Sequence, residues 1–208
     1  MSSLANKISW FVFGFLATGV AFYPVGYLLA TEKINLLQSK SDALLADSYW
    51  QTGFYAHIVF GGIALLVGWS QFSSKLRAKR LKLHKTLGKI YVVSVILSGL
   101  GALYIAYFAT GGLIPSLGFY GLGLVWLATT LGAYLAIRKG NLRQHRILMI
   151  YSYAGCFGAV TLRIWLPLLT LAFGEFIIAY KIVAWLAWVP NLIVAYFIIK
   201  RNVKPALA

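Results

Sequence analysis

The sequence predicts an all-α polytopic membrane protein, with six transmembrane helices in one bundle and both termini in the cytoplasm. Two observations predict it: the length of the apolar runs and the placement of the basic residues between them. The apolar runs cover residues 8–29, 50–72, 87–110, 113–137, 147–172 and 176–199. Each run exceeds the roughly 20 residues that an α-helix needs to cross about 30 Å of hydrocarbon.

The runs favour helices over a β-barrel. No water is present in the bilayer core to bond the backbone, so a spanning segment must satisfy its own N–H and C=O groups. A barrel strand shows strict alternation of apolar and polar residues, and these runs do not. We therefore expect each run to form one helix.

The basic residues set the orientation. Fifteen of the nineteen Lys and Arg residues fall on one face: Lys7, Lys75, Arg77, Lys79, Arg80, Lys82, Lys85, Lys89, Arg138, Lys139, Arg143, Arg146, Lys200, Arg201 and Lys204. The other face carries Lys33 and Lys40, and all four acids lie on or near it. Basic loops stay in the cytoplasm, so this distribution predicts that both ends of the chain are inside.

Composition limits the classes of function. The 208 residues predict a single transmembrane bundle over 1–208 with no soluble domain. Topology accounts for the net charge of +15, so the expected partner is a bilayer with an anionic inner leaflet and no nucleic acid. The lone cysteine, Cys156, excludes an intramolecular disulfide.

The segment between the first two runs is predicted to form a short helix on the outer membrane surface. Its apolar residues are Ile34, Leu37, Leu44 and Leu45.

Three runs carry a stripe of small and polar residues at helical spacing. The stripes are His57, Gly61, Ala64, Gly68 and Gln71; His84, Gly88, Tyr91, Val95, Ser98 and Ala102; and His145, Met149, Ser152, Cys156, Ala159 and Arg163. Small residues let membrane helices approach closely, and hydroxyl groups bond across the contact. Close helix packing explains most of these positions, but it explains the histidines and Arg163 less well, because ionisable groups in spans are costly.

His84 and His145 stand at the cytoplasmic starts of the third and fifth runs. Two imidazoles at one depth can be the axial ligands of a haem. Gly88 provides space one turn away, Met149 is an alternative ligand, and Arg77, Lys82, Arg143 and Arg146 are candidate partners of the propionates. The alternative is that both histidines are interfacial residues that contact lipid headgroups.

His57 and Arg163 are expected at similar depth on the outer side. With Gln71 and Tyr91 they are candidates to line a pocket for a quinone or another polar ligand.

Three prolines within the apolar runs predict kinks in the helices: Pro24, Pro167 and Pro190. Asn191, beside Pro190, is expected to satisfy a freed backbone group.

The region from His57 to Pro167 resembles the DUF2306 family of bacterial membrane proteins, whose function is unknown. The matching residues are His57 with Gln71, Arg77, His84-Lys85, Gly88 and Tyr91, then His145-Arg146 with Met149, and the segment 159–167. The resemblance implies that the protein is located in the bacterial cytoplasmic membrane.

More distantly, the layout is similar to cytochrome b561 and the transmembrane ferric reductases. Their haems are held by histidine pairs on helices two with four and three with five. His84 and His145 would be the second pair; the fourth run has no histidine, which leaves one haem.

Two functions follow as hypotheses. The first is an electron-transfer protein with one b-type haem near the cytoplasmic side that exchanges electrons with a quinone or a cytoplasmic reductant. If it is an enzyme, it would be a membrane oxidoreductase of the quinone or ferric reductase type. The second is a non-redox binding or transport module, or an accessory subunit, with a polar pocket around His57 and Arg163. A homodimer and a larger membrane complex both stay open.

Overall fold

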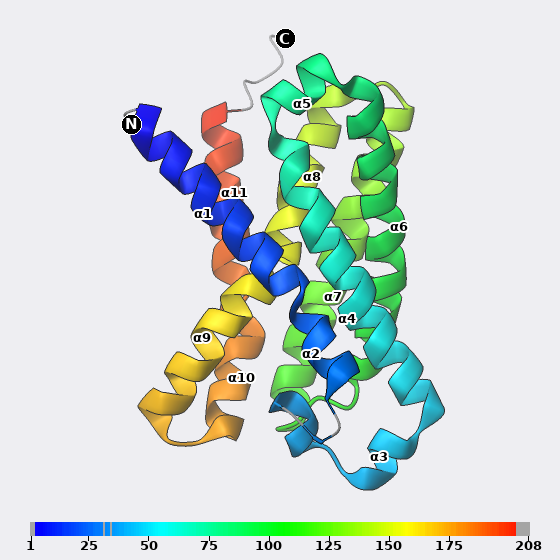
Figure 1. The fold of residues 1–208 in the computed structure, drawn as a ribbon, viewed down its shortest axis with the longest axis vertical. Coiled ribbons are helices and arrows are strands. Elements are labelled where there is room, and N and C mark those ends of the chain that lie inside the picture. The colour runs from blue at the N-terminus through cyan, green and yellow to red at the C-terminus, as the bar shows by residue number, and fades with distance from the viewer. Residues whose placement is uncertain (1–2, 31, 34, 203–208) are drawn as a thin grey trace. The chain divides into compact units, whose positions relative to one another are not determined.

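The structure, a computed structural model, describes residues 3–30, 32–33 and 35–202. In these ranges all regular elements are helical (Figure 1). Six helical segments are long and apolar enough to cross a membrane: Asn6–Leu29, Ser48–Phe72, Leu81–Ala106, Leu113–Arg138, Leu142–Phe173 and Phe176–Arg201. The all-α class and the six spans are therefore confirmed. Ile34 and Lys204, which entered the predictions above, lie outside the described residues.

The third and fifth spans begin earlier than the apolar runs predict. Helix α6 covers Leu81–Ala106 and so includes Lys82, Lys85 and Lys89, which are exposed. Long cationic side chains can extend from a helix end toward water, so a charged first turn does not stop the helix. The consequence is that His84 lies within the first turn of α6.

Two compact units make up the chain, Met1–Ser98 and Gly99–Ala208, and the boundary falls inside α6. The helices before α6 in the first unit are α1 (Ser3–Ala21), α2 (Tyr23–Leu29), η1 (Asn35–Ser39), α3 (Asp42–Ala46), α4 (Ser48–Gly68), η2 (Trp69–Phe72) and α5 (Ser74–Lys79). Helix α1 packs against α4. At this contact Gly62 is required, because a Cβ there would lie 2.6 Å from the carbonyl oxygen of Ala21.

The predicted surface helix is two short helices, η1 and α3. Their ends have local caps: the Ser41 side chain accepts a hydrogen bond from Leu44 N, and Asp47 accepts from Tyr49 N and Trp50 N at the start of α4. Lys33 and Asp42 form an exposed ion pair beside them. These caps explain why the polar segment breaks into separate turns.

The second unit contains α7 (Leu113–Arg138), α8 (Leu142–Cys156), α9 (Gly158–Phe173), α10 (Phe176–Leu186) and α11 (Val189–Asn202). Helices α7 and α8 form a hairpin and lie side by side (Figure 1). The turn uses Gly140 at φ 75°, and Asn141 then caps α8. A second hairpin joins α9 to α10 through Gly174 at φ 70°, a left-handed conformation that glycine adopts without strain.

Three spans are interrupted inside the apolar region. Pro24 and Pro190 each lie in the first turn of a new helix, so the kinks predicted there are confirmed. Helix α9 runs through Pro167 without interruption. The fifth span is broken instead at Phe157, between α8 and α9, where no proline signals it.

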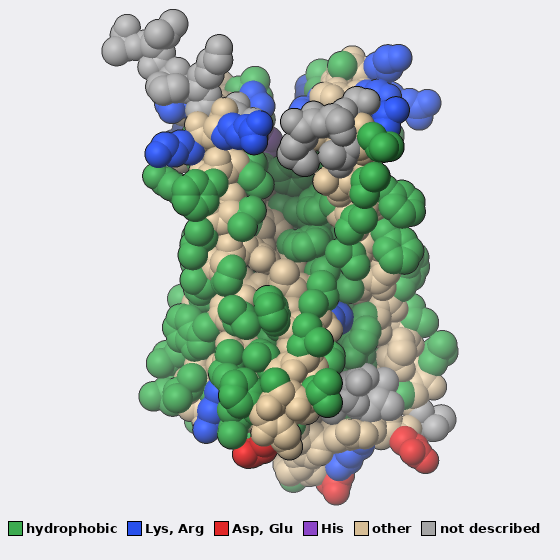
Figure 2. All heavy atoms as spheres, turned by 90° about the vertical axis from the view of Figure 1, so that its left-hand side faces the viewer, with side chains coloured by type: hydrophobic (Ala, Val, Ile, Leu, Met, Phe, Trp, Pro, Cys, Tyr) green, Lys and Arg blue, Asp and Glu red, His purple; other side chains and the backbone are tan. Residues whose placement is uncertain are grey.

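Lipid-facing side chains cover the spans. Phe11 on α1 is 71% exposed and Leu171 on α9 is 84% exposed, and hydrophobic side chains predominate on the face drawn in Figure 2. In water such surfaces would drive aggregation, whereas hydrocarbon solvates them. The spans therefore imply a lipid bilayer as the natural surroundings of this chain.

Candidate functional site

In the first unit, His57 on α4 joins Ser98 on α6. The His57 Nδ1 lies 3.1 Å from Ser98 Oγ and 3.2 Å from Ser98 O, and Ser98 Oγ donates to the backbone oxygen of His57 at 2.8 Å. Gly61, one turn along, brings the helices together, since a Cβ there would lie 3.1 Å from Ser98 Oγ. The stripes of the second and third spans thus face each other in this region.

The same contacts determine which nitrogen of His57 carries a proton. A backbone carbonyl only accepts, and the Ser98 hydroxyl already donates its hydrogen to His57 O. Nδ1 must therefore be the donor, and in the neutral imidazole the lone pair is on Nε2. These contacts show that His57 joins α4 to α6.

Gln71 lies at the other end of the α4–α6 contact. Its side chain is 7% exposed, and Nε2 donates to Ser70 Oγ at 3.3 Å. Ser70 itself donates to Val67 O, which fixes the orientation of the amide. Among the described residues, Gln71 Oε1 has no hydrogen-bond partner. A Cβ on Gly88 would lie 3.6 Å from this oxygen, so a buried acceptor faces the turn that follows His84.

Arg77 is close to Gln71. Its Nη1 donates to the backbone oxygen of Gln71 at 2.8 Å, which ties α5 back to η2. His84 is half-buried in the first turn of α6, and Tyr91, two turns later, is fully buried. The structure thus brings Gln71, Arg77 and the Gly88 turn together in one part of the first unit.

In the second unit, His145 on α8 bonds to α7. Its Nδ1 lies 2.9 Å from the backbone oxygen of Ala133. Because the carbonyl accepts, Nδ1 is again the donor and the neutral ring carries its lone pair on Nε2. A metal-binding histidine commonly donates its second ring nitrogen to a backbone carbonyl in this way. Arg146 beside it is exposed, and Met149, one turn later, is half-buried.

Further along the same helix pair, Ser152 meets Thr130. Their hydroxyl oxygens are 2.6 Å apart, and both residues are fully buried. Thr130 donates to Trp126 O at 2.7 Å, so Ser152 is the donor between the two hydroxyls. This confirms that the polar stripe from His145 to Ser152 faces a neighbouring helix.

The two breaks in the fifth and sixth spans lie side by side. Asn191 Nδ2 contacts Ala154 O at 3.2 Å, Thr161 Oγ1 at 3.1 Å and Ala187 O at 3.0 Å. The Thr161 hydroxyl also donates to Ala187 O. Irregular backbone within a span is tolerated where side chains satisfy its carbonyl groups. Asn191 therefore bonds carbonyl groups at the breaks, as predicted. Thr161 bonds the same region, and the sequence did not predict this role for it.

Arg163 lies six residues after Phe157, on the helix that follows this break. It is half-buried, and its Nη1 donates to Ala159 O on its own helix at 2.9 Å. His57 belongs to the first unit and Arg163 to the second, so the pocket between them stays a prediction. The same holds for the pair of His84 and His145.

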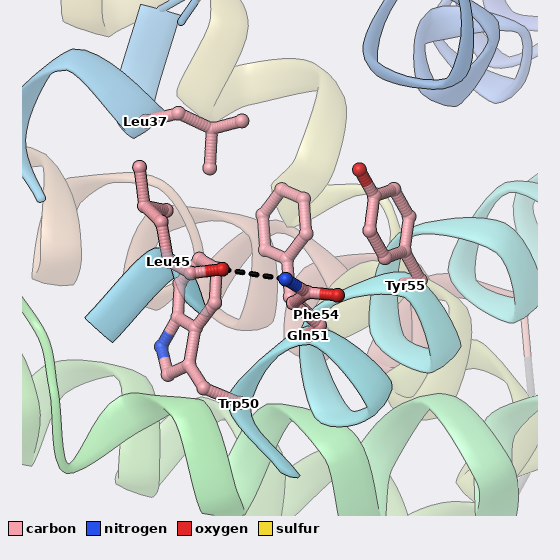
Figure 3. A pocket seen from close by; sticks show the side chains of 6 residues that line it. All are labelled: Leu37, Leu45, Trp50, Gln51, Phe54 and Tyr55. Carbon is pink, nitrogen blue, oxygen red and sulfur yellow. Dashed lines mark hydrogen bonds between the residues drawn. The ribbon is translucent and has the colours of Figure 1, made fainter. Parts of the chain in front are cut away.

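A pocket that the sequence analysis missed lies at the start of α4. It measures about 180 Å³ and is lined by Leu37, Leu45, Trp50, Gln51, Phe54 and Tyr55 (Figure 3). The i, i+4 spacing of Trp50 and Phe54 places two rings on one face of a helix and is the signal that was available. Leu37 and Leu45 come from η1 and α3, whose position depends on tertiary packing.

Among the described residues, no group of three or more His, Cys, Asp and Glu side chains is arranged to hold a metal ion. A haem with two histidine ligands does not need such a group. The described side chains do provide oriented imidazoles, one buried acceptor and one aromatic pocket.

Six apolar helices and polar contacts confined to helix faces define a multi-pass α-helical membrane protein. The family model described as "Predicted membrane protein (DUF2306)" matches residues 54–199, and the chain belongs to this family. Comparison with curated proteins gives no match, and neither does comparison with solved structures.

Proposed function

We propose that this protein is a membrane electron-transfer protein that holds one b-type haem, with His84 and His145 as its axial ligands. The observation that carries the proposal is the bond from His145 Nδ1 to Ala133 O, because it directs the Nε2 lone pair away from α7 and fixes the tautomer that a metal needs. Haem iron would supply reversible one-electron chemistry.

The surroundings of His84 support the same proposal. Gly88 leaves room one turn away, because the nearest atom that a Cβ there would meet is Gln71 Oε1 at 3.6 Å. Arg77 and Arg146 would balance the charge of the propionates. Met149 remains the alternative to His145 as ligand. We place the protein in the bacterial cytoplasmic membrane with both termini inside, on the basis of the basic loops.

An absorption spectrum tests the proposal. Protein purified in detergent from cells supplied with haem should show a Soret band that shifts when dithionite is added. His84→Ala and His145→Ala should each lose the band. His57→Ala is the matched control, because this third histidine is engaged with Ser98 and should leave the spectrum unchanged. A colourless protein that takes up no haem on reconstitution refutes the proposal.

A second candidate is a non-redox binding or transport module that uses Arg163. The paired breaks at Phe157 and at Ala187–Trp188 favour it, since interrupted helices mark the ligand sites of many transporters. If His84→Ala and His145→Ala change neither colour nor activity while Arg163→Ala abolishes ligand binding, the second function replaces the first.

A further inference from the structure

The pocket at the start of α4 combines a flat aromatic wall with polar groups. Trp50 and Phe54 are stacked, with ring centroids 5.0 Å apart and an interplanar angle of 9°. Leu37 from η1 and Leu45 from α3 lie opposite (Figure 3). A volume of about 180 Å³ suits one ring, since an apolar protein cavity of about 150 Å³ takes up benzene.

The polar groups around the pocket can bond a ring that carries oxygen atoms. Gln51 Nε2 donates to Leu45 O at 2.6 Å, so its Oε1 is available as an acceptor. Tyr55 contributes a hydroxyl that both donates and accepts. Trp50 contributes its ring to the wall, because its Nε1 atom is buried and does not reach the pocket.

We propose that this pocket binds the ring of a lipid-soluble quinone or quinol. A quinone carbonyl accepts from the Tyr55 hydroxyl, and a quinol hydroxyl donates to Gln51 Oε1. The pocket lies at the end of α4 opposite the basic residues of α5, where a ring reaches the membrane interface while its tail stays in hydrocarbon. An acyl chain would leave the polar groups without partners.

This inference deepens the proposed function, because it names the class of the electron partner, but its test does not need haem. Binding of decyl-benzoquinone to the purified chain in detergent is measured by calorimetry. We expect saturable binding that weakens at least about tenfold in Leu45→Trp, which fills the pocket from α3. Leu44→Trp, on the same short helix but outside the pocket lining, is the matched control and should bind as the wild type does.

Two further variants and one competition measurement test the same proposal. Leu37→Trp fills the pocket from η1 and should act like Leu45→Trp, so a folding defect of either variant alone does not decide the outcome. Gln51→Leu should weaken binding of the quinol by about threefold to tenfold. Decylbenzene, which has the same tail and no oxygen atoms, should not compete. Equal binding of decylbenzene, or unchanged affinity in both filled variants, overturns the proposal, whatever the haem spectrum shows.

Discussion

His57 and Ser98 are joined in both directions: the imidazole Nδ1–H of His57 points to Ser98 Oγ at 3.1 Å, and the same hydroxyl donates to the backbone oxygen of His57 at 2.8 Å. Each residue thus satisfies a polar group of the other inside the first unit. A lone histidine in a span is usually read as a ligand-binding residue, but here its contacts fasten α4 to α6.

Ser98→Ala should destabilise the chain, because it leaves the His57 donor and carbonyl less well satisfied. A loss of about 1–3 kcal/mol is expected, measured as unfolding free energy in detergent. Thr86→Ala on the same helix is the control, since its hydroxyl bonds only to Lys82 O one turn back and it is exposed. It should change stability by less than about 0.5 kcal/mol. Equal effects of the two substitutions would contradict the role of the His57–Ser98 contact.

Gly62→Ala should separate α1 from α4. The added Cβ would lie 2.6 Å from a backbone oxygen, which cannot move without shifting the helix. We expect a loss of about 1–3 kcal/mol, typical of overpacking. Gly19→Ala is the control in the same unit, because nothing lies within 4 Å of its added Cβ. The control should be neutral or stabilising, since alanine favours helices by about 1 kcal/mol over glycine. Thermal melts of both variants test the contrast.

Asn191→Leu should weaken the paired breaks of the second unit. The substitution removes three contacts and leaves the carbonyl oxygens of Ala154 and Ala187 less well bonded. A loss of about 2 kcal/mol is expected. Thr161→Val should couple to it in a double-mutant cycle, because both side chains bond Ala187 O. Strictly additive effects would show that the two residues act separately.

The burial of Lys40 predicts that the unfolding free energy depends on pH. Burial lowers the pKa of its ammonium group from 10.5 to about 8, since the charged form loses hydration. Between pH 8 and 10.5 the unfolded chain therefore holds a proton at Lys40 that the folded chain does not hold. The linkage relation then makes the unfolding free energy rise with pH across this window.

The rise should be on the order of 1–3 kcal/mol. Lys40→Met lacks the titrating group, so its unfolding free energy should rise less over the same window. Chemical unfolding at several pH values measures the difference between the two proteins. Parallel pH profiles would show that Lys40 does not titrate differently on folding.

Much of the fold was open to prediction because the bilayer imposes it. A run of more than about 20 apolar residues has no other way to satisfy its backbone in hydrocarbon, so the six spans could be counted from the sequence. Pro24 and Pro190 signalled two of the interruptions for an equally local reason, the missing N–H. The polar stripes correctly indicated that His57 and Ser152 face neighbouring helices.

The break at Phe157 had no such signal. It depends on Thr161 and Asn191, which come from different spans and together bond the carbonyl groups around the two breaks. The pocket at Trp50 likewise depends on Leu37 and Leu45, which two short capped helices carry back over α4. Neither arrangement follows from periodicity along a single segment.

By itself the sequence determined the helical class, the number of crossings and the faces on which polar residues gather, because these depend on helical spacing and on the solvation of each segment alone. Only the tertiary structure decided which carbonyl groups His57 and His145 bond, where α8 gives way to α9, and which rings enclose a pocket. Those features arise from contacts between segments far apart in the chain, and their free energy exists only once the helices have packed.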